Sequence, residues 1–149
     1  MDFRTLLFTF DGRIGRKDFW IGTAVLVVAT IGLFFLGGII GFALAGGRGA
    51  AFLVGISGLL LSPPTLAILL KRSNDRGYTP DYVLGLFSLN VAFQIAAMFG
   101  LSDQANPSLI LVAVMTTILV GGLWTLIDLG CFRGTPGPNA FGRDPLNGA

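Results

Sequence analysis

Long apolar runs alternate with short polar segments along this chain. Four runs are long enough to cross a bilayer, at about residues 20–45, 51–71, 80–100 and 107–130. A helix rises about 1.5 Å per residue and the hydrocarbon core is about 30 Å thick, so about 20 apolar residues span it. The pattern therefore predicts an all-α membrane protein with four transmembrane helices, built as a single membrane domain over residues 1–149.

Two further segments flank the four runs. Residues 1–10 are short and amphipathic, with apolar side chains at helical spacing: Phe3, Leu6, Leu7 and Phe10. This N-terminal amphipathic segment fits either a helix lying among the lipid headgroups or a terminus whose apolar side chains rest on the bundle. Residues 131–149 are rich in glycine and proline, which favour turns, so we expect an ordered C-terminal tail.

Prolines indicate where helices should begin or bend. Thr79, Pro80 and Asp81 form a helix-start signal. Threonine caps, proline suits the first helical position, and a carboxylate favours the positive end of the helix dipole. The Pro63–Pro64 pair lies inside the second run. Because proline lacks a backbone donor and clashes with the preceding turn, we expect a kink or break near residues 59–62.

The first run carries small residues at four-residue spacing, namely Gly37, Gly41 and Ala45. Such a stripe lets another helix pack closely, either within this chain or in a second copy. The run is longer than the h-region of about 7–15 residues in a signal peptide, so we expect it to be retained. The glycine-rich residues 46–50 should connect it to the second run.

Composition supports the membrane class and excludes several functions. The chain is 53% hydrophobic and only 12% charged, with a mean hydropathy of +0.78, whereas a soluble domain is about one quarter charged. A net charge of +2 does not indicate nucleic acid as a partner. With no histidine and one cysteine, the chain has no imidazole-based metal site or catalytic triad and no internal disulfide. We predict no metal and no cofactor.

The distribution of cations predicts the orientation in the membrane. Nine of the ten cations lie in three segments: residues 4–17, 71–76 and 133–143. The first connection holds only Arg48, and the second, at residues 102–106, holds none. Short cytoplasmic segments carry the excess of lysine and arginine. Both termini and the central connection should therefore be cytoplasmic.

Three polar segments, residues 11–20, 71–81 and 134–145, should then lie side by side on the cytoplasmic face. Their charged and amide side chains form the candidate anion or headgroup cluster: Arg13, Arg16, Lys17, Arg72, Asp75, Arg76, Asn139 and Asp144. One interpretation is an ion-pair network in which Asp75 and Asp144 hold the arginines and lock the tail under the bundle. The other is that some arginines bind a phosphate-bearing partner, with an anionic phospholipid headgroup as the favoured ligand.

Three polar residues lie within the apolar runs. Asn90 and Gln94 are four residues apart on one helical face, and we expect them to hydrogen-bond to a neighbouring helix. Asp128 lies in the last turn of the fourth run. Since an unpaired charge in the bilayer is costly, it should lie near the interface or pair with an arginine.

Two other function classes remain open. One is a small transporter or channel subunit, which with four spans would act as a homo-oligomer or with a membrane-protein partner. The other is a membrane-embedded enzyme acting on a phosphate-bearing substrate. The chain contains no phosphate-binding loop and no catalytic motif, so we predict no catalytic residues.

Three ordered motifs resemble a known family. The chain reads F-x-G-R-I-x-R-K-x-F-W at residues 10–20, D-R-G at 75–77 and G-x-x-G-x-N-x-F-G-x-D-P at 134–145. In these motifs it is similar to the DUF805 (YhaH-like) family, small bacterial inner-membrane proteins of unknown function. The resemblance covers nearly the whole chain. It implies a multi-pass protein of the bacterial inner (plasma) membrane and implies no particular activity.

The chain departs from the family pattern at three places. Gly15 stands where the family usually has serine, and Asn74 stands where it usually has histidine. Residues 79–82 (Thr-Pro-Asp-Tyr) replace a usual Ser-Gly-Trp-Trp. A role that requires an imidazole at position 74 is therefore not expected here.

Overall fold

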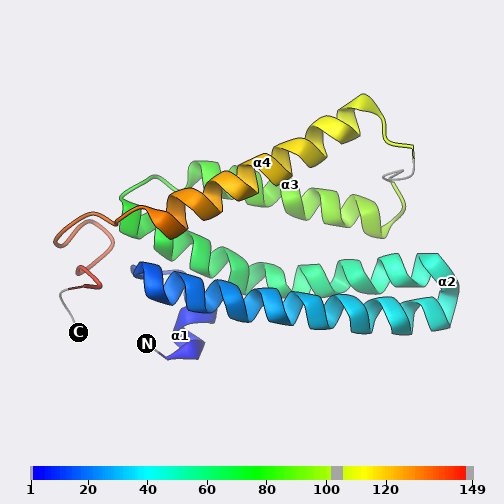
Figure 1. Cartoon of the computed structure of the whole chain (residues 1–149), viewed down its shortest axis with the longest axis horizontal. Coiled ribbons are helices and arrows are strands. Elements are labelled where there is room, and N and C mark those ends of the chain that lie inside the picture. The colour runs from blue at the N-terminus through cyan, green and yellow to red at the C-terminus, as the bar shows by residue number, and fades with distance from the viewer. Residues whose placement is uncertain (1, 102–105, 147–149) are drawn as a thin grey trace.

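The computed structural model describes residues 2–101 and 106–146, and every regular element in those ranges is a helix. The helices are α1 (Phe3–Phe8), α2 (Arg16–Arg76), α3 (Asp81–Met98) and α4 (Leu109–Cys131). The long helices run lengthwise, and both ends of the chain lie at the same end of the molecule (Figure 1). Most of the predicted polar loop at residues 102–106 lies outside the described residues.

The long helix α2 is a hairpin. Its dihedral angles leave the helical region only at Ala45 (φ −149°, ψ 26°) and Gly46 (φ 61°, ψ −150°), where the chain reverses (Figure 1). Glycine tolerates the positive φ at this position without strain. The predicted five-residue connection at 46–50 is therefore wrong, because residues 47–50 are already helical.

Glycines allow the two arms of α2 to touch along their backbones. A Cβ atom on Gly41 would collide with the carbonyl of Gly49, and one on Gly37 would lie 3.2 Å from the carbonyl oxygen of Leu53. Both pairs are symmetric about Ala45, as expected for antiparallel arms. The small-residue stripe thus packs within the chain.

Of the kink or break predicted near residues 59–62, the break does not occur. No non-helical dihedral angle occurs there, although Pro63 and Pro64 lie inside α2. Pro63 has no N–H to donate to the carbonyl of Leu59, four residues earlier. The hydroxyl of Ser62 donates to that carbonyl instead, at 2.7 Å. A side-chain donor that replaces the lost backbone bond lets a membrane helix tolerate proline.

The start of α3 differs from the prediction by one residue. Pro80, not Thr79, is the N-cap, and the helix begins at Asp81 without a side-chain cap. At its other end, Gly100 has φ 68° and the N–H of Leu101 donates to the carbonyl of Ala96 at 2.8 Å. This left-handed ending is a common helix stop.

Three helices, α2, α3 and α4, are long and apolar enough to cross a membrane. Many of their large apolar side chains point outward; Val28 is 70% exposed and Ile110 is 78% exposed. An apolar surface of this extent requires a lipid environment. The buried residues are instead concentrated at the end of the bundle where α2 begins and ends. They include charged side chains: Arg13, Lys71, Arg72, Asp75, Asp128 and Asp144.

Candidate functional site

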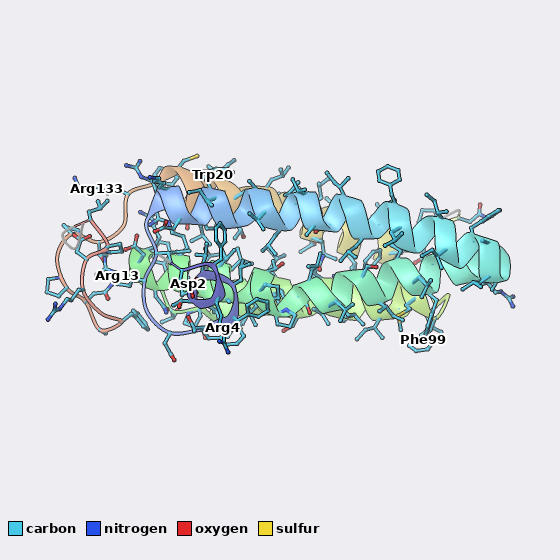
Figure 2. The ribbon with its side chains drawn as sticks, turned by 90° about the horizontal axis from the view of Figure 1, so that it is seen from below. Asp2, Arg4, Arg13, Trp20, Phe99 and Arg133 are labelled. Carbon is cyan, nitrogen blue, oxygen red and sulfur yellow. The ribbon has the colours of Figure 1, made fainter. Side chains whose placement is uncertain are left out.

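The three predicted polar segments meet at one end of the bundle. Figure 2 shows Arg13 and Arg133 at this end and Phe99 near the opposite one. The last turn of α2, which holds Asn74 and Asp75, lies between the segment before α2 and the tail after α4. We call this the polar end.

Asp75 is the centre of the polar end. Its Oδ1 accepts from Nε and Nη2 of Arg13, at 3.0 and 2.9 Å, and its Oδ2 accepts from Nη1 of Arg72. The carboxylate is 5% exposed and both guanidinium side chains are 1% exposed. One buried carboxylate therefore holds two buried cations, which we call the clasp (Arg13, Arg72, Asp75). Removing one partner of such a group leaves an uncompensated buried charge.

Arg13 also holds the tail. It donates to the carbonyls of Thr135 at 2.7 Å, Gly137 at 2.8 Å and Gly142 at 3.3 Å. Thr135 returns two bonds to the carbonyl of Asp75, from its N–H at 2.8 Å and its hydroxyl at 3.0 Å. The expectation of an ordered tail is met in its described part.

Two asparagines extend these contacts. Asn74 donates to the carbonyl of Gly12 at 3.2 Å. Asn139 donates to the carbonyl of Asn74 at 2.9 Å and to the hydroxyl of Thr135 at 3.0 Å. Position 74, where the family usually has histidine, thus ties the N-terminal segment to the last turn of α2 without an imidazole.

The C-terminal end of α4 is capped by side chains from α2. Five consecutive carbonyls, those of residues 129–133, accept hydrogen bonds. Arg72 donates to the carbonyls of Leu129 and Phe132, and Trp20 donates to that of Gly130. Arg16 donates to the carbonyl of Cys131, and Arg76 donates to that of Arg133. The last carbonyls of a helix lack intrahelical partners and carry partial negative charge, so arginines stabilise this end.

Arg76 pairs with Asp128, not with Asp75. Its Nη2 lies 3.2 Å from Oδ1 of Asp128, whose Oδ2 accepts from the hydroxyl of Tyr82 at 3.3 Å. The guanidinium also lies over the rings of Tyr78 and Phe132, 5.1 and 5.3 Å from their centroids. The prediction that Asp128 pairs with an arginine is confirmed.

Lys71 is fully buried and holds α1 in place. Its Nζ donates to the carbonyls of Thr5 and Leu6, both at 2.6 Å. Leu6 of α1 is 3% exposed, within the apolar core of the polar end. The N-terminal segment therefore rests on the bundle, while Phe3 and Phe8 remain exposed.

Asp144 organises the turn of the tail. Its carboxylate accepts the backbone N–H groups of Leu146, at 2.9 Å, and Gly137, at 3.0 Å. These two bonds favour the ionised form and lower the pKa of Asp144 below its ordinary value of 3.8. The side chain therefore acts as a fixed acceptor for the tail backbone.

A cavity of about 440 Å³ lies beside the clasp, between the start of α2 and the tail. Three exposed cations line it: Arg16, Lys17 and Arg133. We call it the basic cleft. The N-terminus of α2, with Gly15 as N-cap, adds the partial positive charge of its free N–H groups. Carboxylates also contribute to the walls: Asp18, Asp75 and Asp144.

The predicted intramembrane pair, Asn90 and Gln94, lies in α3 and does not line the basic cleft. Nε2 of Gln94 donates to Oδ1 of Asn90 at 2.6 Å. The prediction of a bond to a neighbouring helix is therefore corrected: this bond joins the two side chains within α3. Such a bond reduces the cost of placing two amides among apolar helices.

Sequence reasoning placed Arg13, Arg72, Asp75, Asn139 and Asp144 in one region, and the structure brings them together. It missed the roles of other residues there: Trp20, Lys71 and Thr135. Trp20 has the ordinary position of an interfacial aromatic, and nothing in its sequence context points to the carbonyl of Gly130. Among the described residues, no group of three His, Cys, Asp or Glu side chains could hold a metal ion.

Comparison with known proteins supplies the remaining findings. A family model described as "Protein of unknown function (DUF805)" matches residues 7–143. The chain is similar to the uncharacterized protein YiiR of Escherichia coli strain K12, with 36% identity over 97% of this chain and 90% of YiiR. It is also similar to the inner membrane protein YhaH of the same strain, with 27% identity over 91% of this chain and 86% of YhaH. No solved structure gives a significant match.

Proposed function

The chain belongs to the DUF805 family of proteins of unknown function, and from that premise we propose that this inner-membrane protein binds an anionic lipid headgroup. The binding site is the basic cleft (Arg16, Lys17 and Arg133). The clasp beside it is structural and positions the cleft walls. In this proposal the chain crosses the membrane four times, with the polar end in the cytoplasm.

One observation carries the proposal: the polar end contains two classes of cation. Arg13 and Arg72 are buried and share the carboxylate of Asp75. Arg16, Lys17 and Arg133 are exposed and line a cavity of headgroup size. Two other carboxylates line the cavity, Asp18 and Asp144. The three exposed cations outnumber them. The cavity therefore attracts a single phosphate group.

The place of the cleft also favours a lipid. It lies at the start of α2 and just beyond the end of α4, where membrane-spanning helices leave the bilayer. The cytoplasmic leaflet is negatively charged, and each basic residue near it contributes roughly 1 kcal/mol of attraction. A headgroup phosphate at this depth can accept bidentate hydrogen bonds from Arg16 or Arg133.

Native mass spectrometry tests this proposal. The wild-type protein in a neutral detergent is titrated with a phosphatidylglycerol and, separately, with a phosphatidylcholine of the same chain length. The triple variant Arg16→Gln, Lys17→Gln, Arg133→Gln should lose on the order of 10- to 100-fold in phosphatidylglycerol affinity, since three attractive cations are removed.

Arg48→Gln is the matched control, because Arg48 is also exposed but lies beside the hairpin turn at Ala45–Gly46, which is far along α2 from both of its ends. It should keep wild-type affinity. If the triple variant binds phosphatidylglycerol as the wild type does, or if the wild type does not distinguish the two lipids, the cleft is not a headgroup site.

A further inference from the structure

A second cavity, of about 430 Å³, lies between the apolar helices and, among the described residues, shares no lining residue with the basic cleft. Both arms of α2 contribute to it, as do α3 and α4. Its size is within the usual range for small-molecule sites, about 300–1,000 Å³. Most of its wall is apolar, including Phe34, Leu86 and Phe87.

No charged side chain is among the described residues that line this cavity. A charged ligand would therefore enter an apolar space without a counter-ion, which is very costly. An ion pathway does not fit these walls. An uncharged molecule that partitions into the bilayer does.

The polar groups in the wall are mostly acceptors. The hydroxyls of Ser57, Thr65 and Thr125 donate to carbonyls of their own helices, at 2.8, 2.7 and 2.8 Å. Their oxygens retain lone pairs, but their single protons are already used.

The side-chain amides of α3 supply the donors. Oδ1 of Asn90 accepts the bond from Gln94, so the N–H groups of Asn90 remain to donate. No acceptor for them occurs among the described residues. Gly58 leaves the space for the Gln94 amide, since a Cβ atom at position 58 would collide with its Oε1. The second arm of the hairpin thus accommodates an amide that lines the cavity.

We propose that this cavity binds an uncharged, lipid-soluble molecule whose apolar body carries a carbonyl group. The N–H groups of Asn90 donate to the carbonyl, and the apolar walls enclose the rest. Isoprenoid quinones and neutral acylglycerols share this chemistry. This proposal does not depend on the basic cleft, because in the described part of the chain the two cavities share no lining residue and only the cleft is lined by charged side chains.

Binding is tested with the full chain in nanodiscs of phosphatidylcholine. The probes are a decyl-substituted benzoquinone, dioctanoylglycerol and, as a carbonyl-free reference, an alkylbenzene of similar length. Binding is read by native mass spectrometry and by the shift in thermal unfolding. We expect one carbonyl probe to bind at least 10-fold more tightly than the alkylbenzene, and the probe that does so identifies the source of the ligand.

Two variants form a matched pair. Gly122 lines the cavity and Gly85 does not, and a Cβ atom has open space at both positions. Gly122→Phe should fill the cavity and weaken probe binding by at least 10-fold, whereas Gly85→Phe should leave it unchanged. Asn90→Leu should remove the preference for a carbonyl while the alkylbenzene still binds.

Three results would overturn the inference. They are equal binding of all three probes to the wild type, unchanged binding by Gly122→Phe, and an unchanged carbonyl preference in Asn90→Leu. The triple cation variant of the basic cleft serves as a further control and should bind these probes as the wild type does, so failure of one proposal is distinguishable from failure of the other.

Discussion

The polar end and the apolar region of this protein, by which we mean the rest of α2, α3 and α4, invert the usual relation between burial and polarity. At the polar end, Arg13, Arg72 and Asp75 are almost completely buried and hydrogen-bonded. In the apolar region, large apolar side chains such as Val28 and Ile110 are exposed. Lipid tails are as apolar as leucine, so the hydrophobic effect does not drive helices together inside a bilayer. The specific arrangement of the helices must come from other contacts.

Two kinds of contact fill that role, one in each region. At the polar end, buried charges and capped carbonyls join segments that are far apart in the sequence. In the apolar region, glycines let backbones touch, as at Gly41 and Gly49 near the hairpin turn. The polar end therefore selects the overall arrangement, and the apolar region depends on close packing. The predictions below test this division.

The largest effect is expected at the clasp. Asp75→Ala leaves the cations of Arg13 and Arg72 buried without their shared carboxylate, and breaking a buried ion pair costs about 3–5 kcal/mol. The midpoint of thermal unfolding in detergent should fall sharply. Asp81→Ala, at an exposed carboxylate in the first turn of α3, is the control and should change stability by no more than about 1 kcal/mol. Equal midpoints for the two variants would contradict the role of the clasp.

A smaller effect is expected in the apolar region, near the hairpin turn of α2. Gly41→Ala places a methyl group against the carbonyl of Gly49, whereas Gly38→Ala places one in open space on the same helix. Overpacking costs about 1–3 kcal/mol, so the first variant should lower the unfolding midpoint. Alanine is the better helix former, so the second should leave the midpoint unchanged or raise it. If both variants behave alike, the arms of α2 do not depend on glycine contact.

The smallest effect is expected in the tail, where low pH should reduce the stability of the fold. Backbone N–H groups lower the pKa of Asp144 in the folded protein below its ordinary value of 3.8. Its stabilising contribution is therefore fully present above about pH 4 and is lost as the pH falls through the lowered pKa. Asp144→Asn should reduce the loss of stability between pH 5 and pH 3, measured as the unfolding midpoint at each pH. An unchanged acid dependence would mean that the tail does not stabilise the fold through this carboxylate.

Particular residues show how much of the site the sequence could predict. Arg13 and Asp75 could be assigned to one cluster, because the cation distribution places their segments at the same membrane face. Their pairing could not be read from the sequence, and neither could the pairing of Arg76 with Asp128. Five arginines (Arg13, Arg16, Arg72, Arg76 and Arg133) and four carboxylates (Asp18, Asp75, Asp128 and Asp144) lie at this end. Only the packing of the N-terminal segment, α2, α4 and the tail against one another decides which of them meet. Trp20 and Lys71 were missed because both bond to backbone carbonyls, which leave no mark in the sequence.

The sequence by itself determined that the chain is a helical membrane protein, because apolar run length and charge distribution act locally and depend on no partner. Only the tertiary structure decided how those helices are joined. It showed a hairpin turn of two residues at Ala45–Gly46, an unbroken helix through Pro63 because Ser62 replaces the missing donor, and an Asn90–Gln94 bond within one helix. Each of these outcomes depends on the distance between particular atoms, and a pattern of residue types along a chain does not contain that distance.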